Sequence, residues 1–168
     1  PDHRRKQLWI AAAAGGYTTW HSWDGCEGIE DLEYRAPGED FVRPFVDWWS
    51  AQDYWRVDPT WTTAQLGADD PRHLIPVAVA TPQRELVLVY LFTRSSGTSV
   101  FDGLLKIRVP DGVYQVEYFR PADGQPIGKA QTFESSGLRG QRNVSLPDFT
   151  DDLTLRITRI QDRKQSLI

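Results

Sequence analysis

Residues 7–20 read QLWIAAAAGGYTTW, and this stretch carries most of the fold prediction. Residues 7–14 combine strong helix formers with a run of alanines, and Gly15-Gly16 then ends the helix, since glycine readily adopts the conformation that follows a helix C-terminus. Residues 17–20 follow at once with aromatic and β-branched side chains, which favour a strand. The stretch therefore predicts a helix that is joined to a strand by a short connection.

Downstream of this strand, a long loop and a second helix complete the pattern. Residues 21–38 are polar, acidic and irregular, as in loops that carry function. The next apolar side chains recur at the spacing of an amphipathic helix over residues 41–52: Phe41, Phe45, Trp48 and Trp49. Pro44 suits only the first helical turn, so we expect this helix to begin near Arg43, with its two tryptophans in a core. Helix, strand, loop and helix in this order make one increment of a parallel (β/α)8 barrel.

The second half of the chain has the pattern of an all-β domain. Asp58-Pro59 and Asp70-Pro71 interrupt the chain and place a domain boundary near residues 56–72. We therefore expect residues 1–60 to be the terminal helix-strand-helix of a (β/α)8 barrel, and residues 61–168 to form an antiparallel β-sandwich. The fold class is thus α/β plus all-β.

Apolar patterning predicts the strands of the sandwich. Residues 85–92 are nearly all apolar, which is typical of a central strand covered on both faces. Residues 105–109 and 114–118 alternate on either side of the turn dipeptide Asp111-Gly112 and predict a hairpin. A turn at residues 122–124, a strand near residues 127–133 and a last strand at 153–157, which closes the sheet, bring the total to about seven strands without an intervening helix.

Composition argues against several classes of function. The formal net charge of −4 argues against a nucleic-acid partner, and the basic run Arg4-Arg5-Lys6 is too short to form a basic face. No apolar run approaches the ~20 residues that cross a bilayer, so no membrane partner is expected. The single cysteine, Cys26, rules out an internal disulfide and a CxxC zinc site. Methionine is absent even at position 1, so we expect a processed or truncated piece of a longer protein.

Several short motifs are similar to those of a known family. In the first third they are QLW at residues 7–9, AGGYTTWH at 14–21, FVDWW at 45–49 and RVDP at 56–59. In the second half they are the apolar residues 86–91 and YQVEYFRPADG at 114–124. In these motifs and in its organisation the chain resembles the apiosidase-like glycoside hydrolases, whose (β/α)8 barrel is followed by a β-sandwich described as a collagen-binding domain. The resemblance implies the carboxy-terminal portion of a secreted enzyme, extracellular or periplasmic, that cleaves a plant or microbial polysaccharide.

The resemblance also implies where the chemistry lies. The catalytic carboxylates of such barrels end the fourth and seventh strands, so this chain, with only the last strand, would lack the catalytic pair. That last strand commonly presents an aromatic floor, and Trp20 is the candidate, because a sugar ring stacks its C–H face on an indole. His21 and Trp23 follow at the carboxyl end of the strand and are candidates for the same substrate-binding site. The expected partners are a polysaccharide or oligosaccharide and the remainder of the barrel, supplied by the upstream polypeptide or by a second chain.

Other interpretations of these residues stay open. Trp20 could fill the barrel interior instead of contacting sugar. Asp24, Glu27 and Glu30 could form a carboxylate pair or a calcium site, although loop acids are usually solvated and these lack the spacing of a known calcium loop. Cys26 has no motif of a thiol nucleophile beside it. We therefore expect no metal, no cofactor and no catalytic residue in this chain.

A competing hypothesis comes from a different class of protein. In it the chain is a non-catalytic module whose β-sandwich binds glycan or collagen, or serves only as a structural support. A further expectation concerns residues 1–60, whose apolar helix stripes and Trp-rich strand need partners that the chain itself does not contain. Expressed alone, this segment should self-associate or bind a dye that reports apolar surface.

Overall fold

The computed structural model describes residues 2–16, 40–60, 64–66, 74–101, 103–136 and 141–162. Within them the chain forms two α-helices, α1 (Asp2–Ala13) and α3 (Val42–Ser50), and a short 3-10 helix, η1 (Tyr54–Arg56). The strands are β1 (Asp58–Pro59), β2 (Ala64–Leu66), β3 (Leu74–Ala80), β4 (Leu86–Thr93), β5 (Ser99–Val100), β6 (Leu104–Arg108), β7 (Gly112–Phe119), β8 (Gln131–Ser135), β9 (Gln141–Ser145), β10 (Phe149–Thr150) and β11 (Asp152–Gln161).

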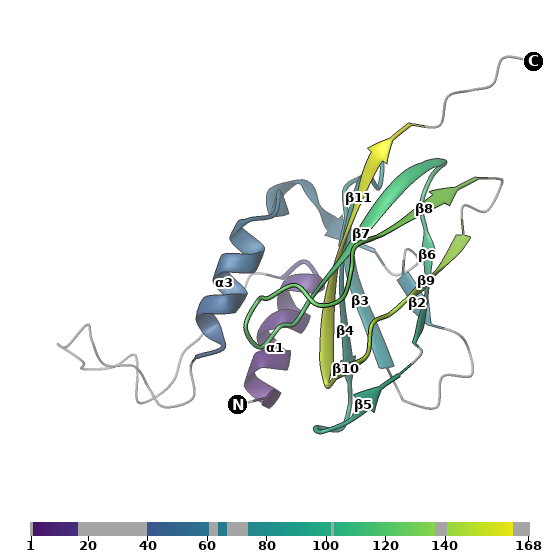
Figure 1. Ribbon diagram of the computed structural model, residues 1–168. Helices are drawn as coiled ribbons and strands as arrows, with labels where there is room; N and C mark the ends of the chain where they lie inside the picture. The colour runs from purple at the N-terminus through teal and green to yellow at the C-terminus, as the bar shows by residue number, and fades with distance from the viewer. Residues whose placement is uncertain are drawn as a thin grey trace, which may run out of the picture.

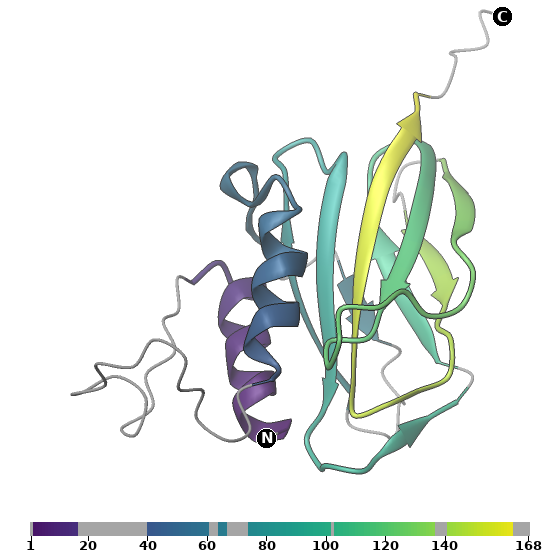
Figure 2. The same cartoon turned by 60° about the vertical axis from the view of Figure 1, so that its left-hand side comes forward.

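The strands form one large sheet and two smaller ones. The large sheet has six antiparallel strands in the order β1-β3-β4-β11-β7-β8. A small sheet of order β2-β6-β9 and the pair β10-β5 lie on one side of it, and the helices lie on the other (Figures 1 and 2). This mostly antiparallel arrangement is compatible with the predicted β-sandwich.

The core of the sandwich lies between the large and small sheets. Its side chains come from alternate positions, because successive residues of a strand point to opposite faces. In β7 and β11 the inward positions are fully or almost fully buried: Tyr114, Val116, Tyr118, Leu153, Leu155 and Ile157. Leu105 and Ile107 of β6 face them from the small sheet. Burial of one such apolar side chain contributes roughly 1.5–3 kcal/mol, so this layer is a main source of stability.

Helices α1 and α3 cover the other face of the large sheet. Trp9 of α1 and Trp48 of α3 lie in a second buried cluster, together with Val79 of β3 and Leu88 and Tyr90 of β4. β4 is therefore covered on both faces, and it lies between β3 and β11 in the sheet. The prediction of a central, continuously apolar strand at residues 85–92 is confirmed.

The ends of the helices agree with the predicted signals. α1 ends at Ala13, and Gly15 follows with a φ of 80°. The N–H of Gly15 donates to the carbonyl of Ala12 and that of Gly16 to the carbonyl of Ala11, both at 2.9 Å, which is the Schellman arrangement. α3 begins at Val42, one residue before the expected start, with Pro44 in its first turn as the sequence required. Neither helix among the described residues is long and apolar enough to cross a bilayer.

The predicted hairpin at Asp111-Gly112 is wrong. β6 pairs with β2 and β9 in the small sheet, whereas β7 pairs with β11 and β8 in the large sheet. The turn therefore carries the chain across the sandwich, and the apolar faces of the two strands meet through the core. Alternation and a turn dipeptide indicate that the chain reverses, but they do not show whether the next strand stays in the same sheet.

Two further strand predictions need correction. The strand expected near residues 127–133 is β8, which begins only at Gln131 and ends at Ser135. The last strand, β11, does not close the sheet at an edge, since it lies between β4 and β7. Its inner position explains why both of its faces are largely buried over Asp152–Leu155.

The two helices run in the same direction, as the colour gradient shows in Figures 1 and 2. They are neighbours, since the Trp9 ring lies 5.6 Å from that of Phe45 and 5.2 Å from that of Trp48. The strand expected at residues 17–20 lies outside the described residues, so the barrel and the division at residue 60 remain predictions. For α1 and α3, the expectation that their apolar stripes need partners from outside the chain is wrong, because both pack on the large sheet.

Candidate functional site

The predicted substrate-binding residues Trp20, His21 and Trp23 lie outside the residues that the structure describes. The same holds for the loop acids and the cysteine weighed as alternatives, Asp24, Cys26, Glu27 and Glu30. Their roles therefore remain predictions. Trp48 and Trp49, expected in a core, are confirmed there with exposed fractions of 6% and 7%.

A buried group of four charged side chains and one tyrosine joins α1 to the large sheet, and we call it the Arg5 cluster: Arg5, Lys6, Tyr90, Asp151 and Asp152. The Arg5 guanidinium donates two hydrogen bonds to the Asp152 carboxylate, from Nε at 3.0 Å and from Nη2 at 3.1 Å. The Tyr90 hydroxyl donates to the same carboxylate at 2.8 Å. Asp152 begins β11, so this bidentate contact ties the first turns of α1 to the centre of the sheet.

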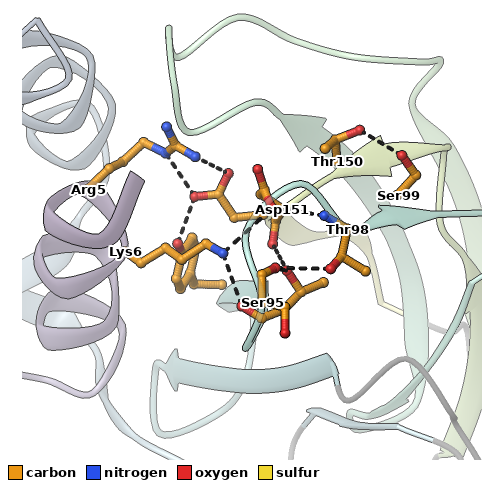
Figure 3. A network of polar contacts seen from close by, with 10 residues as sticks. Arg5, Lys6, Ser95, Thr98, Ser99, Thr150 and Asp151 are labelled. Carbon is orange, nitrogen blue, oxygen red and sulfur yellow. Dashed lines mark hydrogen bonds and ion pairs between the residues drawn. The ribbon is translucent and has the colours of Figure 1, made fainter. Parts of the chain in front are cut away.

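Lys6 makes the second link of the Arg5 cluster. Its Nζ donates to the carbonyl oxygen of Thr93 at 3.0 Å and lies 3.8 Å from Oδ1 of Asp151. Asp151 has a φ of 67° and is held by Thr98, whose N–H donates to Oδ1 at 3.2 Å. Figure 3 shows Arg5 and Lys6 reaching from the helix toward the turn that holds Asp151.

Charge in the Arg5 cluster is balanced, with two cations beside two carboxylates. Burial raises the pKa of Tyr90, and the neighbouring charge of Asp152 raises it further, so the hydroxyl stays protonated and acts as a donor. Each of these charged groups already has a partner, so the cluster fits a structural role better than ligand binding. Two members of the basic run Arg4-Arg5-Lys6 are therefore used inside the protein.

A polar depression lies beside α3, and we call it the α3 groove. It consists of two adjoining cavities of about 340 and 550 Å³ that share Ala51, Gln52 and Arg156. The sheet side of the larger cavity is formed by β7 and β11, through Gln115, Glu117, Arg156 and Thr158. These residues alternate with the core residues of the same strands, so the period of two that builds the core also directs a polar row into the groove.

Each guanidinium that faces the larger cavity has a carboxylate partner. Arg156 lies opposite Glu117 in the strand register and binds it at 2.8 Å, and its guanidinium carbon lies 5.6 Å from the centre of the Phe119 ring. Arg56 of η1 binds Glu85 at 3.0 Å. Arg159 contacts Asp162 at 3.2 Å. The groove thus presents charges of both signs, and its arginines are paired with carboxylates.

Hydrogen bonds and nearby arginines lower the pKa of two acidic groups of the groove, Glu85 and Asp123. The pKa of Glu85 is lowered, first because its carboxylate accepts a hydrogen bond from its own backbone N–H, with Arg56 as a further cause. At the other end of the groove, the hydrogen bond from Arg120 lowers the pKa of Asp123. Both carboxylates are therefore hydrogen-bond acceptors at neutral pH.

Sequence reasoning did not single out the α3 groove. The available signal was the polar alternation of residues 115–117 and 156–158, which indicated outward-facing positions. The pairing of Arg156 with Glu117 was hidden, because these residues are 39 positions apart in the chain and meet only through the order of strands in the sheet.

Among the described residues, no three His, Cys, Asp or Glu side chains gather into a group that could hold a metal ion. The α3 groove presents arginine, carboxylate, amide and aromatic groups, which can form hydrogen bonds and stack on a ligand. No family model matches the sequence, and none of the curated proteins compared with it matches either.

Proposed function

We propose that this chain is the carboxy-terminal portion of a secreted glycoside hydrolase that acts on a plant or microbial polysaccharide. The motifs that resemble apiosidase-like enzymes suggested this function. The structural observation that supports it is the pair α1 and α3, which lie side by side and run in the same direction. Consecutive helices of a (β/α)8 barrel have this relation, since each is joined to the next through a parallel strand.

In this proposal the sandwich is a rigid support for the end of the barrel. The Arg5 cluster fixes α1 to β11, and the rings of Trp9 and Tyr90 stack at 5.7 Å between the helix and β4. A helix held by a buried bidentate pair and by aromatic packing cannot swing relative to the sheet without breaking both. The chain then contributes Trp20, His21 and Trp23 to substrate binding, and the catalytic carboxylates come from the upstream barrel.

The test is an activity assay on the product of the complete gene. We expect it to release reducing sugar from at least one plant or microbial polysaccharide in a broad panel. Trp20→Ala should lower kcat/KM about tenfold or more, because loss of a stacking platform is worth roughly 1.4 kcal/mol. Trp55→Ala, which removes an indole that is 76% exposed on η1, is the matched control and should leave the activity unchanged. A complete product that cleaves no glycan in the panel would refute the proposal.

The alternative is a non-catalytic module that binds glycan or collagen, and the α3 groove favours it because the groove includes the sandwich itself. Pull-down with the whole chain against insoluble polysaccharides and collagen separates the two functions. Binding of the chain, together with an inactive complete product, supports the alternative. The helices must be present in this experiment, because they cover one face of the large sheet.

A further inference from the structure

We propose that the α3 groove binds a neutral stretch of glycan. The inference rests on the proposed function only in its choice of a glycan among neutral, polar ligands. Its structural basis is the charge, the hydrogen-bonding capacity and the apolar surface of the groove.

The charged groups of the groove favour an uncharged ligand, because its arginines are already paired with carboxylates. The larger cavity is lined by three arginines and by three acidic residues: Arg56, Arg156, Arg159, Asp53, Glu85 and Glu117. The smaller cavity shares Arg156 with the larger one and adds Arg43, Asp47 and Asp123, so the lining of the two together has four arginines and five acidic residues. An anion would have to displace a carboxylate from its arginine, and a cation would have to displace an arginine from its carboxylate. Either exchange would only replace one ion pair by another, so neither an anion nor a cation gains binding free energy from its charge.

The ion pairs retain hydrogen-bonding capacity for hydroxyl groups. A guanidinium has five N–H donors and a carboxylate about four acceptor sites, so the Arg156–Glu117 pair at 2.8 Å leaves several of each unused by that contact. Donors and acceptors that lie side by side suit vicinal hydroxyls, each of which both donates and accepts. Gln115 and Thr158, which face each other in the strand register, add an amide and a hydroxyl to the same row.

Apolar atoms in the groove suit the C–H faces of sugar rings. Ile160, which is 53% exposed, and Leu86 line the larger cavity, and Phe119 and Trp48 line the smaller one. The larger cavity, of about 550 Å³, is within the roughly 300–1,000 Å³ that small-molecule sites occupy. The groove therefore offers both polar and apolar groups, as the surface of an oligosaccharide does.

The test is calorimetric titration of the whole chain with soluble neutral glycans, namely arabinoxylan, mixed-linkage glucan and galactomannan, and with the acidic glycan polygalacturonate. We expect at least one neutral glycan to bind, with an affinity that raised salt leaves within about twofold, since no net charge is neutralised. The acidic glycan should bind more weakly. Preference for the acidic glycan, or affinity for none of the neutral ones, would overturn the inference.

A double variant assigns the binding to the groove. Arg156→Gln with Glu117→Gln removes both charges together, so neither is left unpaired; the size of residue 117 is kept, and residue 156 becomes shorter. We expect binding to fall about tenfold or more, with an unchanged urea midpoint as evidence of folding. Arg108→Gln, which changes an exposed arginine on β6 of the small sheet, should bind as the wild type does. Wild-type affinity in the double variant would exclude the groove as the binding site. Cleavage of glycan by the complete gene product is a separate experiment, and its result bears only on the proposed function.

Discussion

At the residue scale, docking of α1 depends on Asp152. Its side chain is 2% exposed, and it accepts hydrogen bonds from both Arg5 and Tyr90. A buried pair of this kind adds little net stability compared with apolar residues of the same size, because both ions lose water. Removal of one partner should destabilise the fold strongly, because the remaining charge stays buried without an opposite charge beside it.

Asp152→Ala tests this argument. We expect the free energy of unfolding to fall by about 3–5 kcal/mol, as is usual when a buried ion pair is broken from one side. Urea denaturation measures the change. Asp47→Ala is the control, because Asp47 pairs with Arg43 on the exposed side of α3, and it should leave the urea midpoint essentially unchanged. Equal midpoints for wild type and Asp152→Ala would contradict the assigned importance of the cluster.

Substitution of Gly15 tests how tightly the end of α1 packs against β1. It has a φ of 80°, and a Cβ there would lie 2.4 Å from Cγ of Pro59. Gly97 has a φ of 74° and open space around it. Gly97→Ala should therefore cost only the backbone strain, about 1–2 kcal/mol, whereas Gly15→Ala should cost roughly 1–3 kcal/mol more from overpacking. Equal losses in urea denaturation would mean that the end of α1 is free to move away from β1.

At the element scale, we expect the packing of the two helices on the large sheet to contribute strongly to the free energy of unfolding. Trp9 is fully buried, and its ring lies within 6 Å of those of Trp48, Trp49 and Tyr90. We expect Trp9→Ala to lower the free energy of unfolding by about 3–5 kcal/mol, the usual cost of a large cavity in a core. Trp55→Ala, on the exposed side of η1, should change it by no more than about 0.5 kcal/mol. Similar values for the two variants in urea denaturation would show that Trp9 is not part of a packed core.

Removal of both helices tests the domain boundary predicted at residue 60. Residues 61–168 alone would expose Val79, Leu88 and Tyr90, which are at most 1% exposed in the whole chain. We expect this fragment to self-associate and to bind a dye that fluoresces on apolar surfaces, whereas the whole chain should bind less. Size-exclusion chromatography and dye titration give the measurement. A soluble, monomeric fragment with cooperative unfolding would support the boundary predicted from the sequence.

At the scale of the whole molecule, buried tyrosines make stability depend on alkaline pH. Burial raises the pKa of Tyr118 to about 12 and raises those of Tyr90 and Tyr114 from the usual 10.0. Between the unfolded and folded pKa values the unfolded chain releases protons that the folded chain retains, so stability is complete below pH 10.0 and falls as pH rises toward 12. We expect alkaline unfolding to coincide with the appearance of tyrosinate absorbance. Smooth titration of all tyrosines near pH 10 without loss of circular dichroism would contradict it.

Parts of the fold could be predicted from the sequence, but the α3 groove could not. The end of α1 at Gly15 and the central strand β4 followed from local chemistry, since a glycine pair ends a helix and a continuous apolar run needs cover on both faces. The hairpin at Asp111-Gly112 failed because turn chemistry is shared by hairpins and by connections between sheets. The α3 groove could not be foreseen, since Glu117 and Arg156 come together only through the strand order β11-β7.

The sequence by itself determined the local elements: two amphipathic or alanine-rich helices, and strands with buried alternate residues. These depend on side-chain periodicity and backbone preference, which act over a few neighbouring positions. Only the tertiary structure decided that Arg5 and Lys6 turn inward to Asp151 and Asp152, and that the helices share a core with β4. Contacts of this kind join residues as many as 147 positions apart, and their free energy depends on burial and partner geometry, which local periodicity does not encode.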